Sequence, residues 1–518
     1  MGAVLLVHLV VGTALMLRGR TGRVAALVAL VAPLTALAWW AAHLGTVLDG
    51  GSVDEVHQWV PTLDLSVALR FDGFAALMVV IVSGIGVAVF AYSWSYFGPD
   101  VPLGRIMGLL TLFSGAMVGV VLADNLILLY GFWELTSVTS FLLIGNSYRD
   151  AAARSAALQA ILVTGAGGLA MLFGFVILGI QAGTYSLSAI LADPPGGAAV
   201  TAALVLIAVG AFTKSAQYPF HSWLPGAMVA PTPISAYLHS ATMVKAGVYL
   251  VARMAPAFAL VAGGWRPLVI TVGLVSMVAG ALRALRQHDL KLLLAFGTIS
   301  QLGFMVVLFG VGLEATSLAG CAVILGHALF KATLFMVVGI VDHGTGTRDI
   351  RELPHLGDGW RTTKVVAVVA AASMAGVPLT FGFVAKELGF EGMLHAPMAG
   401  SGLVLAVLVL GSALTAAYAA RFVAGLHGTF RTAPADPVET ASADSHATTT
   451  ATHRHAPDWA FLAPPVLLAV LTVAFGVVPS LLDGLVGAAA DSLTGSVAGA
   501  HLAPVSYTHL TLPTILRV

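Results

Sequence analysis

The amino-acid sequence predicts an all-α polytopic membrane protein with about fourteen transmembrane helices. Of its 518 residues, 58% are hydrophobic and only 9% are charged, and the mean hydropathy is +0.95. A soluble domain usually carries about 25% charged residues. Apolar runs close to the roughly 20 residues that a bilayer-spanning helix needs recur along the chain. Composition and run length therefore indicate the same fold class.

The apolar runs define the expected spans in chain order. We place them at residues 2–17, 23–45, 73–95, 105–122, 126–145, 156–180, 200–218, 233–254, 267–285, 291–312, 318–341, 364–394, 401–424 and 460–480. The seventh and twelfth are irregular, because prolines and glycines interrupt them. We therefore expect broken helices at these two positions.

Two connections between the spans are long. Residues 49–72 alternate apolar and polar side chains after Trp59, which is typical of a short hairpin or an interfacial cap. The segment 432–457 is rich in Ala, Thr, Asp and His and is expected to be a mobile loop. Its three histidines, which could chelate a metal weakly, are better explained as solvated loop residues: His446, His453 and His455.

The expected organisation has five parts. They are two spans and an outer loop at 1–72, a core of spans three to thirteen at 73–431, the cytoplasmic loop at 432–458, the last span and outer end at 459–504, and a non-native tail at 505–518. The tail is similar to translated adapter sequence, so we interpret the gene as truncated near Pro504 and exclude the tail from functional reasoning.

Basic residues indicate the orientation of the chain. They gather at one end of the spans, from Arg18 after the first to Arg421 after the thirteenth, whereas the other end receives only Arg70, Arg253 and Arg266. Lys and Arg accumulate on the cytoplasmic side of membrane proteins. We therefore expect a multi-pass protein of the cell membrane with its N-terminus on the outer face.

Composition also excludes several classes of function. The formal net charge is zero and the basic residues are scattered, which argues against a nucleic-acid partner. The single cysteine, Cys321, excludes an intrachain disulfide and a cysteine-ligated cluster. No Gly-rich phosphate-binding loop is present, so nucleotide-driven pumping is not indicated. We expect no cofactor and no metal site.

The stretch from Ala211 to Arg253 is the most informative part of the chain. It is surrounded by apolar segments, yet it contains Lys214, His239 and Lys245, and four prolines lie between the first and the other two. An ionisable group at bilayer depth costs roughly 2.5–3.5 kcal/mol and usually marks an ion or proton path. Broken helices are tolerated there where a cavity or a neighbour satisfies the backbone. We interpret the chain as an ion-moving subunit.

Lysine placement supports this interpretation. Of the six lysines, four lie inside apolar spans: Lys214, Lys245, Lys331 and Lys386. Lysines kept only for solubility would lie in loops. The alternative is that the long side chain reaches the interface, which fits Lys364 at a span end and could fit Lys386. It does not account for all four.

Glu134 is the one carboxylate placed in the middle of a span. An isolated carboxyl would be protonated in the bilayer, whereas pairing with a lysine from another span would keep it ionised. It is therefore a candidate switch, and a purely structural ion pair is the alternative.

Two histidine–lysine combinations extend the set. His327 and Lys331 are four residues apart and share a helix face, which suits proton transfer. His239 and Lys245 are six apart and do not share a face. For each histidine, a hydrogen-bonded packing role remains the alternative. Lys386 follows an interruption at Pro378, so both broken spans carry a lysine, as an internal duplication would leave.

Several of these segments occur together in one order: LLYGFWELTSVTSFLLIG around Glu134, the stretch with Lys214, HDLKLLLAFGTISQLGFM from His288, HALFKATLF with Lys331, and GFVAKE with Lys386. Together they resemble the antiporter-like family shared by Mrp-type multisubunit cation/proton antiporters and respiratory complex I. Within that family, ALQAILVTGAGGLAMLFG from Ala157 and VGIVDHGTGTRDIREL from Val338 are most similar to the A-type subunit of the Mrp antiporter.

The resemblance implies two inverted five-helix repeats, spans four to eight and nine to thirteen. It also implies a chain of proton-translocating residues: Glu134 and Lys214 as an ion-pair switch, then His239, Lys245, His327 and Lys331, and a terminal Lys386. The implied function is proton transfer coupled to sodium or another monovalent cation. The implied partners are the other subunits of a membrane complex. Such a subunit has no catalytic chemistry of its own.

Two other functions compete with this one. The first is a proton-pumping subunit of complex I or of a related membrane-bound hydrogenase, where the chain would be part of a translocase. The second is a stand-alone transporter of organic solutes. The second is weaker, because the buried polar groups are proton-exchanging side chains and do not form a compact solute pocket.

Overall fold

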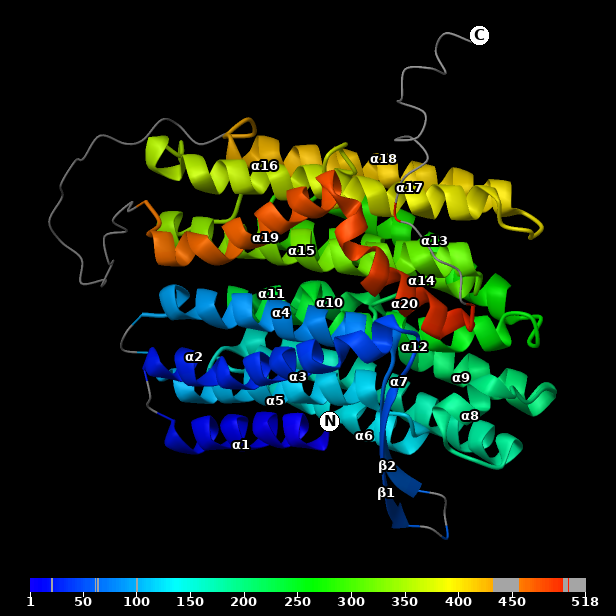
Figure 1. Ribbon diagram of the computed structural model, residues 1–518. Coiled ribbons are helices and arrows are strands. Elements are labelled where there is room, and N and C mark those ends of the chain that lie inside the picture. The colour runs from blue at the N-terminus through cyan, green and yellow to red at the C-terminus, as the bar shows by residue number, and fades with distance from the viewer. Residues whose placement is uncertain are drawn as a thin grey trace, which may run out of the picture.

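The computed structural model describes residues 1–19, 22–60, 62, 65–98, 101–431, 456–496 and 502. These residues form a bundle of helices that lie side by side along one direction, and a two-stranded hairpin projects from the bundle (Figure 1). The loop histidines His446, His453 and His455 and the tail at 505–518 lie outside the described residues.

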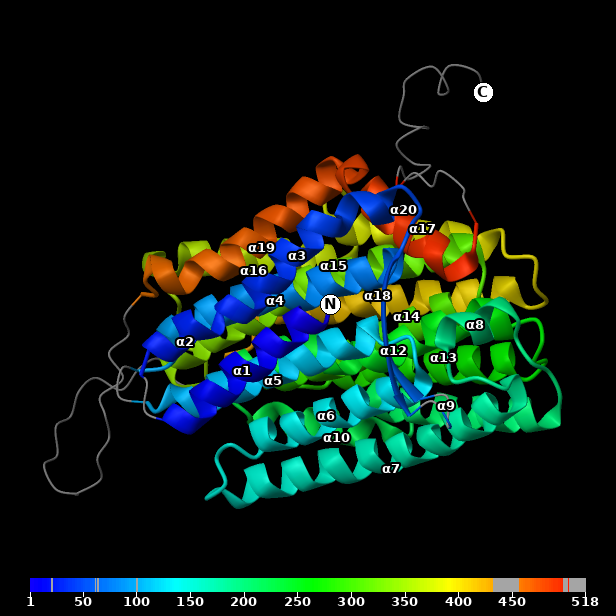
Figure 2. The ribbon, with the colours of Figure 1, turned by 60° about the horizontal axis from the view of Figure 1, so that its bottom comes forward.

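The described residues up to Phe258 form twelve α-helices. They are α1 (Gly2–Arg18), α2 (Val24–Ala29), α3 (Val31–Leu48), α4 (Gly73–Tyr96), α5 (Leu103–Leu122), α6 (Leu126–Ile144), α7 (Ala151–Ala182), α8 (Leu187–Ala192), α9 (Ala198–Lys214), α10 (Trp223–Gly226), α11 (Thr232–Ser240) and α12 (Met243–Phe258). The long helix α7 lies along one edge of the bundle, beside α6 and α10 (Figure 2).

The second half continues the bundle. Its helices are α13 (Trp265–Leu285), α14 (Leu290–Gly310), α15 (Glu314–Thr345), α16 (Arg361–Ala375), α17 (Phe381–Leu394), α18 (Ser401–Leu426), α19 (Trp459–Val477) and α20 (Asp483–Thr494). Helix α14 is buried along nearly its whole length, and every residue of α15 from 319 to 341 is buried. Polar groups on α15 are therefore kept away from lipid.

Ten helices among the described residues are long and apolar enough to cross a membrane, with α2 and α3 taken together. Shorter or interrupted helices occupy the other expected positions: α1, α9 with α10, α11 with α12, and α16 with α17. The chain is therefore a largely helical membrane protein. The number of crossings and the repeat symmetry stay predictions.

The expected interruptions are present. Helix α9 ends at Lys214 and is followed by Ala216 in the left-handed region, with φ 48°. Helix α16 ends at Ala375, and α17 begins at Phe381 after Leu379, with φ 70°. Both breaks coincide with prolines and glycines in the sequence.

A third break was not predicted. The sequence indicated one span at 233–254, but α11 ends at Ser240 and α12 begins at Met243. The Thr242 hydroxyl donates to the Tyr237 carbonyl at 2.8 Å, and the Ser240 hydroxyl donates to the Ala236 carbonyl. Such hydroxyl bonds to the preceding turn compete with the regular helix ladder and bend helices.

The connection between α3 and α4 contains a β-hairpin of β1 (Val53–Val60) and β2 (Leu65–Phe71), paired antiparallel. Bridges at Leu69–Ala123 and Asn125–Ser186 extend this pairing to the start of α6 and the start of α8. The Met1 amino group lies 2.8 Å from Glu55 of β1. The N-terminus and the hairpin therefore lie at the same end of the bundle, which we call the hairpin end.

Candidate functional site

Lys214 is the last residue of α9 and is fully buried. Its ammonium donates to the Trp133 carbonyl at 3.1 Å and to the Ser137 hydroxyl at 2.7 Å, both on α6. It also lies 5.1 Å from the centre of the Trp133 ring, within cation–π range. The break after α9 thus points a lysine at the middle of α6.

Glu134 lies between these two contacts on α6, so it is a neighbour of Lys214. No ion pair within 4.0 Å joins the two in the described parts of the chain. The half-buried carboxylate instead packs against Gly168 of α7, where a β-carbon would overlap it. One of its oxygens is buried without a hydrogen-bond partner among the described residues. The expected pair is therefore adjacent but not directly bonded.

The break between α11 and α12 brings together residues that helix periodicity separates. Lys245 donates to the Ile324 carbonyl of α15 at 2.7 Å, and His327 Nδ1 lies 3.3 Å from the Ser240 carbonyl. Lys245 and His327 are thus held where α15 crosses this break. His239, one residue before the end of α11, is also buried, and its Nδ1 has no partner in the described structure.

Lys331 and Lys386 meet at the end of α16. Lys331 donates to the Leu294 carbonyl at 3.0 Å and lies 3.6 Å from the Met374 sulfur. Lys386 donates to the carbonyls of Met374 at 2.9 Å and Ala375 at 3.0 Å. These are among the last carbonyls of α16, which carry the negative end of the helix dipole. Lys386 is 7% exposed, and its ammonium bonds to carbonyls at the break between α16 and α17 and does not extend to the surface.

Lys291 is a buried lysine that sequence reasoning missed. The sequence pattern groups it with the basic residues of an inner connection, but it is 1% exposed. Asp289 caps α14 by accepting the Lys291 amide hydrogen at 2.7 Å, so Lys291 lies in the first turn, and its ammonium donates to the Ala230 carbonyl before α11. The uninterrupted apolar run after HDLK is the sequence signal that places this lysine inside the protein.

The elements that carry these residues adjoin one another. Helix α9 lies beside α12, α11 beside α15, and α15 beside α17. The series consists of Glu134, Lys214, His239, Lys245, His327, Lys331 and Lys386, with Lys291 at the side of α11. These contacts define a helical membrane protein whose interior holds buried and half-buried ionisable side chains on adjoining helices.

Known proteins share this fold. A family profile described as NADH:quinone oxidoreductase/Mrp antiporter, TM, matches residues 123–415, and one described as NADH-ubiquinone oxidoreductase (complex I), chain 5 N-terminus, matches residues 59–105. The first covers more than half of the chain. The protein therefore belongs to the antiporter-like family shared by Mrp antiporters and complex I, as the sequence motifs predicted.

One curated relative and two solved structures illustrate the similarity. The A-type subunit of the Na(+)/H(+) antiporter of Alkalihalophilus pseudofirmus is 39% identical over 479 residues, which are 88% of this chain and 58% of that protein. The Mrp complex of Dietzia sp. matches with a TM-score of 0.83 and 38% identity, over 98% of this chain and 54% of that one. Respiratory complex I of Thermus thermophilus shares the fold, with a TM-score of 0.77 and 22% identity over 95% and 99% of the two chains.

The chain spans about half the length of the curated relatives it matches.

Proposed function

We propose that this chain is the proton-translocating subunit of a multisubunit monovalent cation/proton antiporter. The observation that carries the proposal is the environment of its buried lysines. Lys214, Lys245, Lys331 and Lys386 each donate to carbonyl or hydroxyl oxygens at a helix break or on a facing helix. No carboxylate lies within 4.0 Å of any of them among the described residues.

This environment suits lysines that change protonation state. A carbonyl oxygen accepts a hydrogen bond from an ammonium and from a neutral amine alike. Without a direct counter-ion, the charged form is costly in a low-dielectric interior, so a proton can leave. A charge that arrives on one lysine weakens proton binding at the next. In the proposed order of transfer, the charge of Glu134 changes how tightly Lys214 binds its proton. The proton then passes by way of His239, Lys245, His327 and Lys331 to Lys386.

The coupled cation and the partners belong to the same proposal. Relatives named as subunits of Na(+)/H(+) antiporters favour sodium and a complex of several membrane subunits. The chain would lie in the cell membrane with its hairpin end outside, because basic residues gather at the opposite end. A subunit of complex I is the second candidate, and the fold shared with the Thermus thermophilus complex is the observation in its favour.

The first experiment measures proton flux driven by sodium or potassium in inverted vesicles that lack other antiporters and contain the complete complex. Cation-dependent flux is expected with the wild type and is expected to be lost in Glu134→Ala and in Lys214→Ala. Proton movement that needs an electron donor and no cation would favour the complex I assignment. Unchanged flux in both variants would remove these residues from the pathway.

A substitution at Gly168 tests the position of Glu134 while keeping its carboxylate. Replacing Gly168 with alanine places a β-carbon where the Glu134 carboxylate lies, so that carboxylate must move away from its position beside Lys214. We expect flux several-fold below the wild type in the same vesicle assay. Gly165→Ala on the same helix is the control, because a β-carbon there meets nothing within 4 Å. Equal loss in both variants would indicate a general effect on α7.

A further inference from the structure

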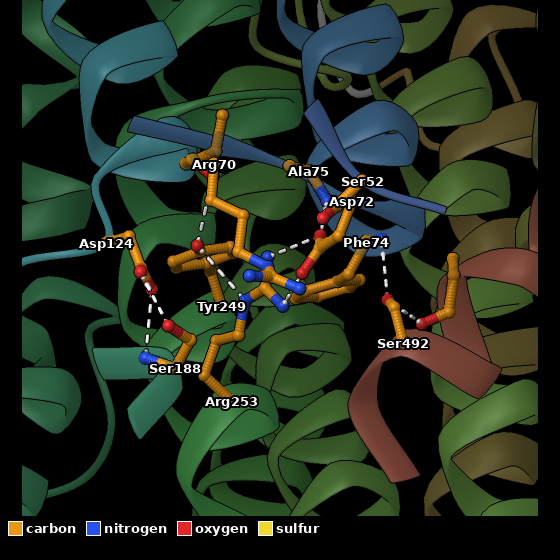
Figure 3. Close-up of polar contacts among 12 residues, drawn as sticks. Ser52, Arg70, Asp72, Phe74, Ala75, Asp124, Ser188, Tyr249, Arg253 and Ser492 are labelled. Atoms are coloured by element: carbon orange, nitrogen blue, oxygen red, sulfur yellow. Dashed lines mark hydrogen bonds and ion pairs between the residues drawn. The ribbon is translucent and has the colours of Figure 1, made fainter. Parts of the chain in front are cut away.

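A polar cavity of about 380 Å³ lies at the hairpin end of the bundle. Its lining includes Arg70, Asp72, Asp124, Ser188, Tyr249 and Arg253, which point toward one another in Figure 3. Since one water molecule occupies about 30 Å³ of liquid, the cavity has room for several. None of the residues assigned to the buried series lines it.

Segments distant in sequence build this cavity and are joined through the backbone. The Asp124 amide donates to the Ala68 carbonyl of β2 at 2.9 Å, and the Leu187 amide of α8 donates to the Asp124 carbonyl at 2.9 Å. Asp124 is therefore held between the hairpin and α8, with its side chain toward the cavity (Figure 3).

Two of the charged groups in the cavity neutralise each other. The Arg253 guanidinium donates to both Asp72 oxygens, at 2.6 and 2.8 Å, and both residues are more than nine-tenths buried. The guanidinium also lies over the rings of Phe74 and Tyr249, at 5.3 and 5.2 Å. This two-pronged pair is fixed by geometry and stays charged.

Asp124 is different, because no ion pair within 4.0 Å reaches it in the part of the chain that the structure describes. Its two oxygens accept hydrogen bonds from the Ser188 amide at 2.9 Å and the Ser188 hydroxyl at 2.6 Å. Burial raises the pKa of the Asp124 carboxyl above its usual range, although the bonds from Ser188 and the charges of Arg70 and Arg253 oppose this. The other titratable groups that line the cavity are Asp72 and Tyr249.

Helix α12 connects this cavity to the buried series. Lys245, Tyr249 and Arg253 are spaced four residues apart, so they form one stripe along the helix. The Tyr249 hydroxyl accepts from Arg253 Nε at 3.1 Å and donates to the Val121 carbonyl at 3.0 Å. At 1.5 Å per residue, Lys245 lies about 12 Å from Arg253 along the helix axis.

We propose that this cavity is the water-filled vestibule through which Lys245 exchanges protons with the solution at the hairpin end, with Asp124 as the proton-exchanging carboxylate. A proton leaves the Lys245 ammonium, passes along water beside Tyr249, and binds the Asp124 carboxylate. The lysine becomes a neutral amine and the aspartate a neutral acid. The acid then releases the proton to the solution. This inference rests on the function proposed above.

The hydrogen bonds of the lining favour a proton over a metal cation as the ligand of the cavity. A metal cation needs several free oxygen ligands, and both Asp124 oxygens already accept hydrogen bonds from Ser188. Asp72 cannot compensate, because its two oxygens are already bonded to Arg253. A sodium ion bound at Asp124 is the competing outcome that the experiment separates.

The test compares Asp124→Asn, Asp124→Glu and the wild type in the complete complex, in right-side-out vesicles whose external pH is varied. We expect Asp124→Asn to lower the maximal flux by at least about tenfold, with little change in the sodium concentration for half-maximal rate. Asp124→Glu should retain flux with a shifted external-pH profile. Asp193→Asn is the matched control, since Asp193 is exposed just after α8 and does not line the cavity.

Two transport results would overturn the proposal. One is Asp124→Asn with wild-type flux and pH profile, and the other is a large change in sodium dependence with an unchanged pH profile, which would indicate a cation site. A Ser188→Cys variant gives an independent arm that needs no transport. A membrane-impermeant thiol reagent added outside should label this cysteine, because Ser188 lines the cavity. The native Cys321 is buried and should add no background labelling.

The outcomes separate the two proposals. Absence of cation-dependent flux in the wild type would contradict the proposed function, and labelling at Ser188→Cys would still support the vestibule. Wild-type flux together with an unreactive Ser188→Cys thiol, in a complex that assembles normally, would contradict the vestibule alone. If Asp124→Asn fails to assemble, Asp124→Glu and the labelling variant decide.

Discussion

An Arg253→Ala variant is expected to lose about 3–5 kcal/mol of folding free energy, the usual result of removing one partner from a buried ion pair. Asp72 would remain buried without its guanidinium partner. Burial by itself raises the pKa of Asp72, but in the intact protein the charge and hydrogen bonds of Arg253 outweigh burial and lower it. Without Arg253 the carboxyl binds its proton more tightly when folded than when unfolded. The destabilisation should therefore shrink as pH falls.

Thermal unfolding of the purified protein in detergent, followed at several pH values, measures this effect. Arg70→Ala is the matched control at the same end of the bundle, because Arg70 and its partner Asp54, 3.2 Å away, are both exposed. An exposed ion pair contributes about 0–1 kcal/mol. If the two variants lowered the unfolding temperature equally, the Asp72–Arg253 pair would have no special role in stability.

A Lys291→Met variant is expected to reduce cation-dependent proton flux by at least about tenfold, if Lys291 supplies protons to the series. The lysine is buried beside α11, and its ammonium bonds to the backbone of the segment that leads to His239. Arg348, whose charge acts on Lys291, pairs with Asp289 at 3.2 Å and with Asp342 at 3.8 Å at the end of the bundle opposite the hairpin. Under the proposed function, this polar group supplies protons from the solution at that end to the middle of the bundle.

The same vesicle assay tests Lys291, and two further variants define its role. Lys291→Arg keeps the positive charge but cannot release a proton. If Lys291 acts by proton exchange, this variant should also show reduced flux. Lys364→Met is the control, since Lys364 is only half-buried and bonds to the Leu356 carbonyl at a span end. Normal flux in Lys291→Arg would assign the residue an electrostatic role only.

The breaks that carry prolines and glycines were predictable, because these residues cannot continue a regular helix. Pro219 and Pro225 marked the end of α9, and Pro378 marked the end of α16. The break at Ala241 and Thr242 was not predictable in this way. Hydroxyl bonds to the preceding turn accompany it, and the same kind of bond occurs in the uninterrupted helix α6.

The buried lysines inside apolar spans were likewise evident from the sequence, whereas their contacts were not. Lys214 reaches Ser137 and the Trp133 carbonyl, and no pattern in the sequence specifies that geometry over a direct bond to Glu134. The cavity at the hairpin end was missed for another reason. Asp72 and Arg253 are 181 residues apart, and no sequence pattern indicates that they pair.

The backbone links at the hairpin end affect how the molecule can move. Residues 68–69, 123–125 and 185–187 are joined like adjacent strands, and the Asp72–Arg253 pair attaches the start of α4 to the end of α12. These connections restrict the motion of the segments at the hairpin end relative to one another. Under the proposed function, we therefore expect helices to bend at their breaks, residues 215–219, 241–242 and 376–380. Their displacement should increase toward the end opposite the hairpin.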